Sequence, residues 1–210
     1  MVQKISYMNY PNQIISKFPN VKTTIFTIMS KLAQEHNAIN LSQGFPDFSA
    51  DKRLLDAVTN TMNKGQNQYA PMPGVMTLRE KIAEKTESLY SAKYNPDTEI
   101  TITAGATQAI FTAILSVVKE DDEVIIFEPA YDCYMPAIDL AGGKPVFIPL
   151  KFPDFTIDWD FVKKMINHRT RMIIINTPNN PSGTILNAAD IQKLEKLITP
   201  LSSLFTHLKN

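Results

Sequence analysis

Apolar residues recur at helical spacing in the first part of the chain. From Val21 they fall at intervals of three and four residues, which predicts a helix that ends near His36. Thr77 and Glu80 form the T-x-x-E pattern of a capping box and predict the start of another helix. Three other segments are polar or broken by proline, which indicates an arm, an extended turn and a loop: 1–19, 38–48 and 64–74.

The pattern changes at residue 99, where short apolar runs begin to alternate with helical patterns. The apolar runs predict strands at 99–103, 122–128, 144–150 and 171–177. Helices are predicted at 109–117, 134–141, 158–166 and from Asn187 onward, with Pro200 expected to end the last one. Strands that alternate with helices form a largely parallel sheet covered on both faces, so we predict a doubly wound α/β fold. Such sheets bind ligands at the carboxyl ends of their strands.

Composition narrows the class of protein. Hydrophobic residues make up 44% and charged residues 20%, as in a soluble globular protein. Lys+Arg and Asp+Glu are equal at 21 each and are scattered, which argues against nucleic acid and anionic membranes as partners. We find no apolar run of membrane-spanning length and no secretory signal. The single Cys133 fits a reducing compartment, so we expect a cytoplasmic protein.

Metal binding is not expected, because the three histidines are widely spaced and have no carboxylate in register: His36, His168 and His207. Cys133 is interpreted as an inert, half-buried residue rather than a nucleophile, since Asp132 is its only nearby acid and no histidine is close in sequence.

The stretch "TITAGATQAIF" (101–111) joins a predicted strand directly to a helix. Gly105 allows the tight turn, and the N–H groups of Ala106, Thr107 and Gln108 would face outward at the helix N-terminus. With the Thr107 hydroxyl they would form a cup for an anion. The motif alone is weak evidence for an anion site, because a plain strand-to-helix turn explains it more often.

Two further polar stretches follow predicted strands. In "FEPAYDCY" (127–134), Tyr131 could lie flat against a ring, although Tyr131 and Tyr134 could also simply cover the sheet end. In "NTPNNPSG" (176–183), the Asn180 amide can donate to an anionic oxygen, and the flanking prolines would hold its backbone. The alternative is a type I turn that happens to be rich in Asn and Pro.

Together these stretches resemble the fold-type-I, pyridoxal-5′-phosphate (PLP) dependent aminotransferases of class I/II. "INLSQGFPDF", "NQYAPMPG", "TAGATQAIF" and "EPAYDCYMPAIDLAGGKPV" look like the methionine and kynurenine aminotransferases. The resemblance covers about residues 20–198 and implies the aspartate aminotransferase-like fold. It also implies an N-terminal arm with a small-domain segment (1–45), an incomplete large PLP-binding domain (46–198) and an aberrant tail (199–210).

The resemblance implies roles for matching residues. Gly105, Ala106 and Thr107 would bind the PLP phosphate, and Tyr131 would stack on the pyridine ring. Asn180 would hydrogen-bond the phenolic oxygen of the ring.

Other matching residues would face the substrate or a second subunit. Asn180 would approach the substrate carboxylate, Asn176 would lie at the cleft, and Gly44 would offer its backbone to the carboxylate. Tyr69 would reach the phosphate of the partner subunit, which implies a homodimer. The implied reaction moves an amino group between an amino acid, of methionine, kynurenine or aromatic type, and a 2-oxo acid.

The resemblance stops before the family's reacting groups. Relatives continue into an Asp-x-x-Tyr strand, the Schiff-base lysine and a carboxylate-binding arginine, whereas this chain reads "LITPLSSLFTHLKN". Thr206 and Lys209 form a T-x-x-K pattern, which we interpret as coincidence. We therefore expect a truncated or frame-shifted product that is inactive alone, with no catalytic residue of its own. The alternatives are a remnant that at most binds PLP weakly, and a C–S lyase, which would also need the lysine.

Overall fold

The structure is a computed structural model that describes residues 16–18, 23–44 and 46–207. The chain forms two compact units, with the boundary between Tyr69 and Ala70. Each unit is described separately below. The domain boundaries expected after residues 45 and 198 stay predictions.

The first unit contains two helices, α1 (Ile25–Glu35) and α2 (Lys52–Asn63). Thr24 begins α1 by accepting a hydrogen bond from the Thr27 N–H at 3.3 Å, and the helix ends at His36 as predicted. Asp51 begins α2 in the same way, since its carboxylate accepts from the Arg53 N–H at 2.8 Å. The sequence patterns did not predict α2.

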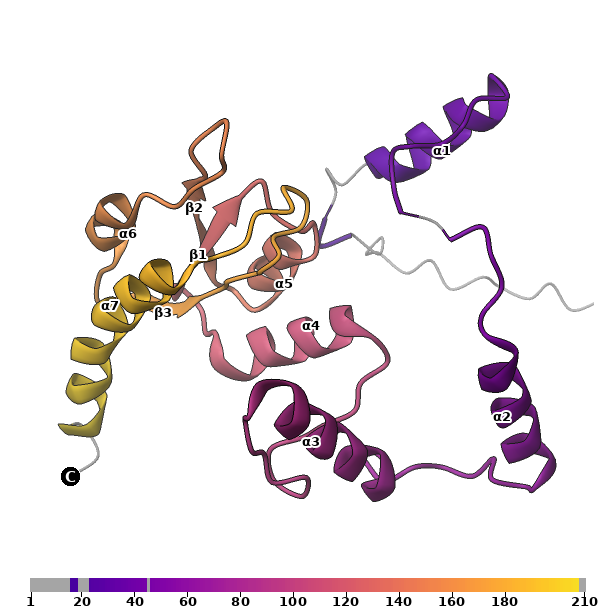
Figure 1. Ribbon diagram of the computed structural model, residues 1–210. Coiled ribbons are helices and arrows are strands. Elements are labelled where there is room, and N and C mark those ends of the chain that lie inside the picture. Colours follow the sequence, from indigo (N-terminus) through magenta and orange to yellow (C-terminus); the bar gives the residue numbers. More distant parts are fainter. Residues whose placement is uncertain (1–15, 19–22, 45, 208–210) are drawn as a thin grey trace, which may run out of the picture. The chain divides into compact units, whose positions relative to one another are not determined.

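The second unit is an α/β structure. Its elements along the chain are α3 (Met76–Tyr90), α4 (Ala106–Val117), β1 (Glu123–Glu128), α5 (Tyr134–Leu140), β2 (Lys144–Pro149), α6 (Trp159–Met165), β3 (Thr170–Ile173) and α7 (Ala188–His207). Figure 1 labels these elements, with α4 and α5 on one side of the sheet and α6 and α7 on the other.

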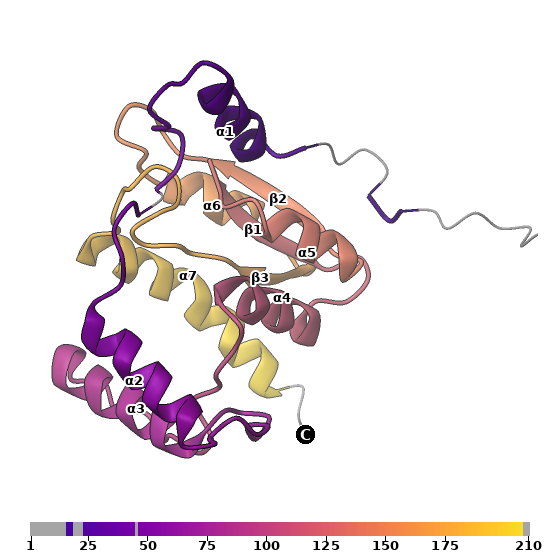
Figure 2. The same ribbon diagram turned by 90° about the vertical axis from the view of Figure 1, so that its right-hand side faces the viewer.

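The strands lie in the order β2-β1-β3 and are parallel, as predicted. Figure 2 shows the three strands side by side. Val124 and Ile126 of β1 pack with α4 and α5, whereas Ile125 and Phe127 pack with α6 and with residues of α7. Since neighbouring side chains of a strand point to opposite faces, β1 is buried on both. This confirms a parallel sheet covered by helices on both faces.

The helix α5 agrees with the one predicted at 134–141, and two glycines follow it. Gly142 has φ +81°, which favours glycine. At Gly143 a Cβ atom would lie 2.6 Å from Cγ1 of Val118, so only glycine lets β2 start this close to the end of α4.

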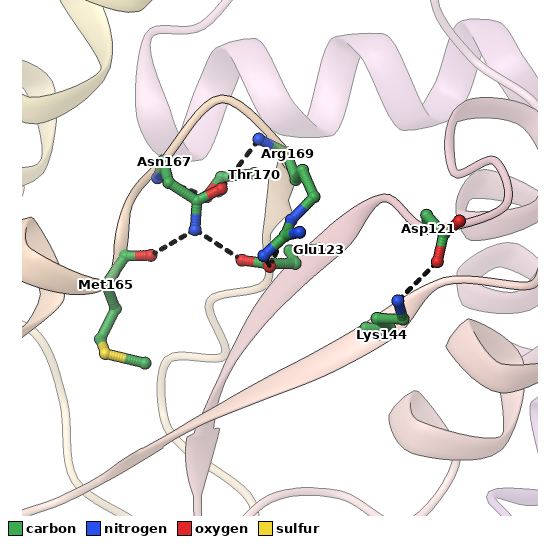
Figure 3. Close-up of polar contacts among 7 residues, drawn as sticks. All are labelled: Asp121, Glu123, Lys144, Met165, Asn167, Arg169 and Thr170. Atoms are coloured by element: carbon green, nitrogen blue, oxygen red, sulfur yellow. Dashed lines mark hydrogen bonds and ion pairs between the residues drawn. The ribbon is translucent and has the colours of Figure 1, made fainter.

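Charged side chains join the amino ends of the strands (Figure 3). The buried carboxylate of Glu123 accepts from Arg169 Nε at 2.8 Å and from Asn167 Nδ2 at 2.7 Å. Arg171 Nε donates to Asp122 at 3.0 Å. The register of β1 and β3 shifts between Glu123 and Val124, because Arg171 is an extra residue there. Arg169, just before β3, and the bulged Arg171 therefore tie the start of β3 to the start of β1.

The predicted strand at 99–103 is wrong. These residues form no strand, and the Ile102 N–H donates instead to the Pro73 carbonyl at 2.9 Å. The Ile102 side chain packs against Gly74. An apolar, β-branched run favours a strand, but a strand also needs a neighbour for its backbone groups, and no strand described here pairs with this run.

Three smaller predictions are corrected. The capping box at Thr77 and Glu80 is wrong, because α3 begins after Val75 without a side-chain cap. The strand predicted at 171–177 is shorter, although the Ile174 N–H still donates to the Ile125 carbonyl at 2.9 Å. Pro200 does not end α7, which continues to His207.

The Asp122–Arg171 pair predicts a pH-dependent stability. Arg171 and the Lys119 N–H hold the pKa of Asp122 below its ordinary value. A depressed pKa stabilises the fold above the pKa of the unfolded state, and this stabilisation is lost as pH falls through the folded value. Asp122→Asn should therefore lower the unfolding free energy by about 1 kcal/mol at neutral pH and by much less in acid.

Urea unfolding at neutral and acidic pH checks this, with Asp121→Asn as the matched control. Asp121 pairs with Lys144, but both side chains are exposed, so this control should change stability little at any pH. An Asp122 effect of equal size at both pH values would contradict the assignment.

Candidate functional site

Polar groups gather where β1 and β3 end and where α4 begins. The chain that follows β1 leads through Pro129 and Tyr131 into α5. The chain that follows β3 turns between Asn176 and Thr184 before α7. Parallel strands β1 and β3 end at the same edge of the sheet, so these two loops are neighbours.

The N-terminus of α4 is open to a ligand. Gly105 is the N-cap residue of α4 and has φ +87°. No other atom lies within 4 Å of the position that a Cβ on Gly105 would take. No side chain caps the helix, and its first turn carries no acidic residue. The N–H groups of Ala106 and Thr107 therefore keep their ability to bind an anion. The Gln108 side chain accepts from the Ala104 N–H and holds the preceding turn.

Thr107 and Cys133 line one pocket of about 440 Å³, which brings the start of α4 beside the start of α5. Burial and the nearby Asp132 raise the pKa of the Cys133 thiol. The thiol therefore stays protonated at neutral pH, in agreement with its interpretation as an inert residue. Sequence reasoning named Gln108 only for its backbone N–H and did not single out Phe111, which follows on α4; the side chains of both residues line this pocket.

The Tyr131 ring is half-buried and rests on the core under α5. Its centroid lies 6.0 Å from that of Tyr134 in an edge-to-face arrangement. Tyr134 is buried, and burial raises its pKa. Because Tyr134 is held in the core, its contact with the Tyr131 ring gives that ring a defined orientation. Tyr131 precedes Cys133 by two residues in the sequence.

The two neighbouring asparagines of the 176–184 turn have different surroundings. The half-buried Asn179 donates from Nδ2 to the Pro129 carbonyl at 3.2 Å and to Ser182 Oγ at 2.9 Å. Its backbone closes the turn, with Asn179 N–H donating to the Thr184 carbonyl at 2.8 Å. Asn179 thus ties the loop after β3 to the loop after β1. Sequence reasoning missed this residue, because two adjacent asparagines look alike in the motif.

Asn180 is exposed and is held by its backbone. Its N–H donates to Asn176 Oδ1 at 2.6 Å, and the peptide bonds before Pro178 and Pro181 are cis. No described hydrogen bond of the protein uses the Asn180 side-chain amide, which is therefore available to a ligand. Asn176 itself lines a second pocket with Phe127, Tyr134 and Asn179 as neighbours.

The structure places Thr107 and Cys133 in one pocket, but neither Tyr131 nor Asn180 lines it. The Asn179–Pro129 hydrogen bond joins the loop that carries Asn180 to the loop after β1. That Thr107, Tyr131 and Asn180 bind one ligand stays a prediction. Gly44 and Tyr69 belong to the first unit, where both are exposed, and their roles stay predictions.

Among the residues that the structure describes, no group of three or more His, Cys, Asp or Glu side chains is arranged to hold a metal ion. In the same part of the chain, no helix has the length and apolar character needed to cross a membrane.

Comparison with known proteins identifies the class. The family model of aminotransferase class I and II matches residues 36–202, so the chain belongs to this family. Its sheet and helices are the aspartate aminotransferase-like fold of PLP-dependent enzymes, as expected from the sequence motifs. Members of this family use PLP.

Individual relatives show how much of the family fold is present. Methionine aminotransferase of Escherichia coli is 50% identical over 183 residues, which are 87% of this chain and 47% of the relative. Human kynurenine–oxoglutarate transaminase 3 is 33% identical over 86% of this chain and 44% of its own length. A crystal structure of an E. coli protein with a methionine aminotransferase function superposes with a TM-score of 0.87 at 49% identity. That match covers 90% of this chain and 50% of the other. The chain spans about half the length of the curated relatives it matches.

The two asparagines predict opposite mutational results. Asn179→Ala removes two side-chain hydrogen bonds of a half-buried residue and should lower the unfolding free energy by about 1–2 kcal/mol. Asn180→Ala removes only an exposed side chain and should change it by less than about 0.5 kcal/mol. Denaturant unfolding of the two variants compares them directly, and equal effects would contradict the division of roles.

Proposed function

We propose that this chain carries the PLP-binding part of an aminotransferase that moves an amino group between an amino acid and a 2-oxo acid. We further propose methionine, kynurenine or aromatic amino acids as donors, a cytoplasmic location and a homodimeric assembly. The E. coli methionine aminotransferase and the human kynurenine transaminase support this choice of substrates.

One observation carries the cofactor assignment. The uncapped N-terminus of α4 shares a pocket with Cys133, which follows β1 in the same loop as Tyr131. A helix N-terminus with free N–H groups and no acidic residue attracts a phosphate. The fit is also steric, because no atom lies within 4 Å of the space that a Gly105 Cβ would fill. The residues present therefore suit a phosphorylated, flat cofactor.

Each proposed contact follows from the chemistry of its side chain. The N–H groups of Ala106 and Thr107 and the Thr107 hydroxyl donate to the phosphate. Tyr131 offers an aromatic surface to the ring. The exposed amide of Asn180 donates to the phenolic oxygen and to the substrate carboxylate. When bound, PLP supplies an electron sink for bonds at the substrate Cα.

Substrate and subunit contacts complete the proposal. Asn176 accepts from the Asn180 N–H at 2.6 Å and so positions it toward the substrate. The exposed Gly44 offers its backbone to the carboxylate, and the fully exposed Tyr69 reaches the phosphate of the partner subunit. No residue of this sequence takes the role of the family's PLP-binding lysine in our proposal, so the 210-residue chain binds PLP weakly and does not turn over.

The first test concerns turnover. The purified chain with PLP should give no product in an amino-acid/2-oxo-acid assay. After borohydride reduction, mass spectrometry should find no single lysine labelled with PLP, because a covalent attachment needs a dedicated lysine. Stoichiometric labelling of Lys209, which lies outside the described residues, would overturn this expectation.

The second test concerns the phosphate contact. Thr107→Val removes a hydroxyl donor and should weaken PLP binding about tenfold in a fluorescence titration. Thr112→Val changes the same kind of exposed residue on the same helix and should leave binding unchanged. Pyridoxal, which lacks the phosphate, should bind more weakly than PLP and be insensitive to Thr107→Val. Equal binding of pyridoxal and PLP would exclude the phosphate site.

A further inference from the structure

A third pocket, separate from those lined by Thr107 and by Asn176, lies between α6 and α7, on the face of the sheet opposite α4. Its volume is 670 Å³, within the range of small-molecule sites. None of the residues proposed to bind PLP or substrate lines it. The lining side chains form two groups, a charged rim and an apolar floor.

The rim carries more positive than negative charge. Its residues are four lysines and two aspartates: Lys151, Lys163, Lys193, Lys196, Asp158 and Asp160. Lys151 is already neutralised, since its Nζ lies 2.8 Å from Asp158 Oδ2. Among the described contacts, no ion pair or hydrogen bond engages the side chains of the other three lysines. The pocket therefore presents three unneutralised ammonium groups against the single carboxylate of Asp160.

These three exposed lysines bring like charges together around the pocket. Lys193 and Lys196 are three residues apart on α7, so they are neighbours on its surface and repel each other. Lys163 faces them from α6 across the same pocket. A hollow lined by one sign of charge and walled by protein focuses the field inside it, which raises its attraction for anions above that of a flat surface.

The floor is apolar and held in place. Trp159 is buried, and its indole N–H donates to Asp190 Oδ1 at 2.8 Å, which ties α6 to α7. The Trp159 ring also packs edge-to-face on Phe127 with centroids 6.3 Å apart. Ile157 and Leu197 complete the apolar lining beside it. A rigid apolar surface beneath a cationic rim suits a ligand that has both an anionic group and an apolar body.

We propose that the pocket between α6 and α7 binds a small organic anion, with its anionic group on Lys163, Lys193 and Lys196 and its apolar body against Trp159 and Leu197. An aromatic phosphate ester has this chemistry. A simple inorganic anion lacks the apolar part, and a neutral aromatic lacks the charge. The inference does not depend on the proposed PLP site.

Trp159 provides the readout, because it is the single tryptophan of the chain. Its indole N–H gives one signal in a ¹⁵N–¹H correlation spectrum of the full chain. Titration with 1-naphthyl phosphate should move this signal saturably. Inorganic phosphate and 1-naphthol should each bind at least about tenfold more weakly. Equal responses to 1-naphthol and 1-naphthyl phosphate would overturn the proposal.

Matched variants test the rim. Replacing Lys163, Lys193 and Lys196 together by glutamine should weaken 1-naphthyl phosphate binding at least about tenfold. The control replaces Lys64, Lys85 and Lys119, three exposed lysines outside the pocket, and should leave the affinity unchanged. Both variants lose the same total charge, so an equal loss in both would mean non-specific attraction and would overturn the proposal. An unmoved indole signal in the unaltered chain would do the same.

Discussion

The burial of β1 on both faces is the constraint on which the rest of the second unit depends. Residues 123–127 are all buried, with α4 and α5 over one face and α6 and α7 over the other. A strand with no exposed face cannot slip by one residue without exchanging its two apolar sets. The positions of its ends are therefore determined, and with them the starting points of the loops that carry the site. Pro129 follows directly, and Asn179 anchors the neighbouring loop to its carbonyl.

The amino ends of the strands contribute ion pairs that stabilise the sheet, whereas the carboxyl ends carry the groups proposed to bind a ligand. At the amino ends, Glu123 and Asp122 are paired with Arg169 and Arg171, and these pairs hold the bulged register of β3. At the carboxyl ends, no described residue forms such a pair with the exposed amide of Asn180 or caps the start of α4 with its side chain. Polar groups that are unpaired in the protein are the ones that a ligand can recruit, because binding does not first have to break an internal contact.

The sequence predicted the elements whose patterns are local and missed those that depend on distant partners. The starts of α6 and α7 are set by side chains that are close in the sequence. Asp158 caps α6, and Asn187 and Asp190 cap α7 reciprocally. The run at 99–103 has the composition of a strand, but whether it becomes one depends on a neighbouring strand, which no local pattern can reveal. The contrast between Asn179 and Asn180 depends on Pro129, 50 residues away along the chain. Helix α2 is an exception, because Leu54, Val58 and Met62 recur at helical spacing and this local pattern was missed.

The proposed cofactor site separates into parts with different physical requirements. Anion binding at α4 needs only a helix N-terminus and a glycine that clears the approach, and both are properties of a short continuous segment. Ring placement needs two loops, and the Asn179–Pro129 bond brings these together within the second unit. By the family resemblance, amino transfer additionally needs a lysine and an acidic partner for the ring nitrogen. Anion binding at α4 does not depend on either group, because the contacts come from backbone N–H groups.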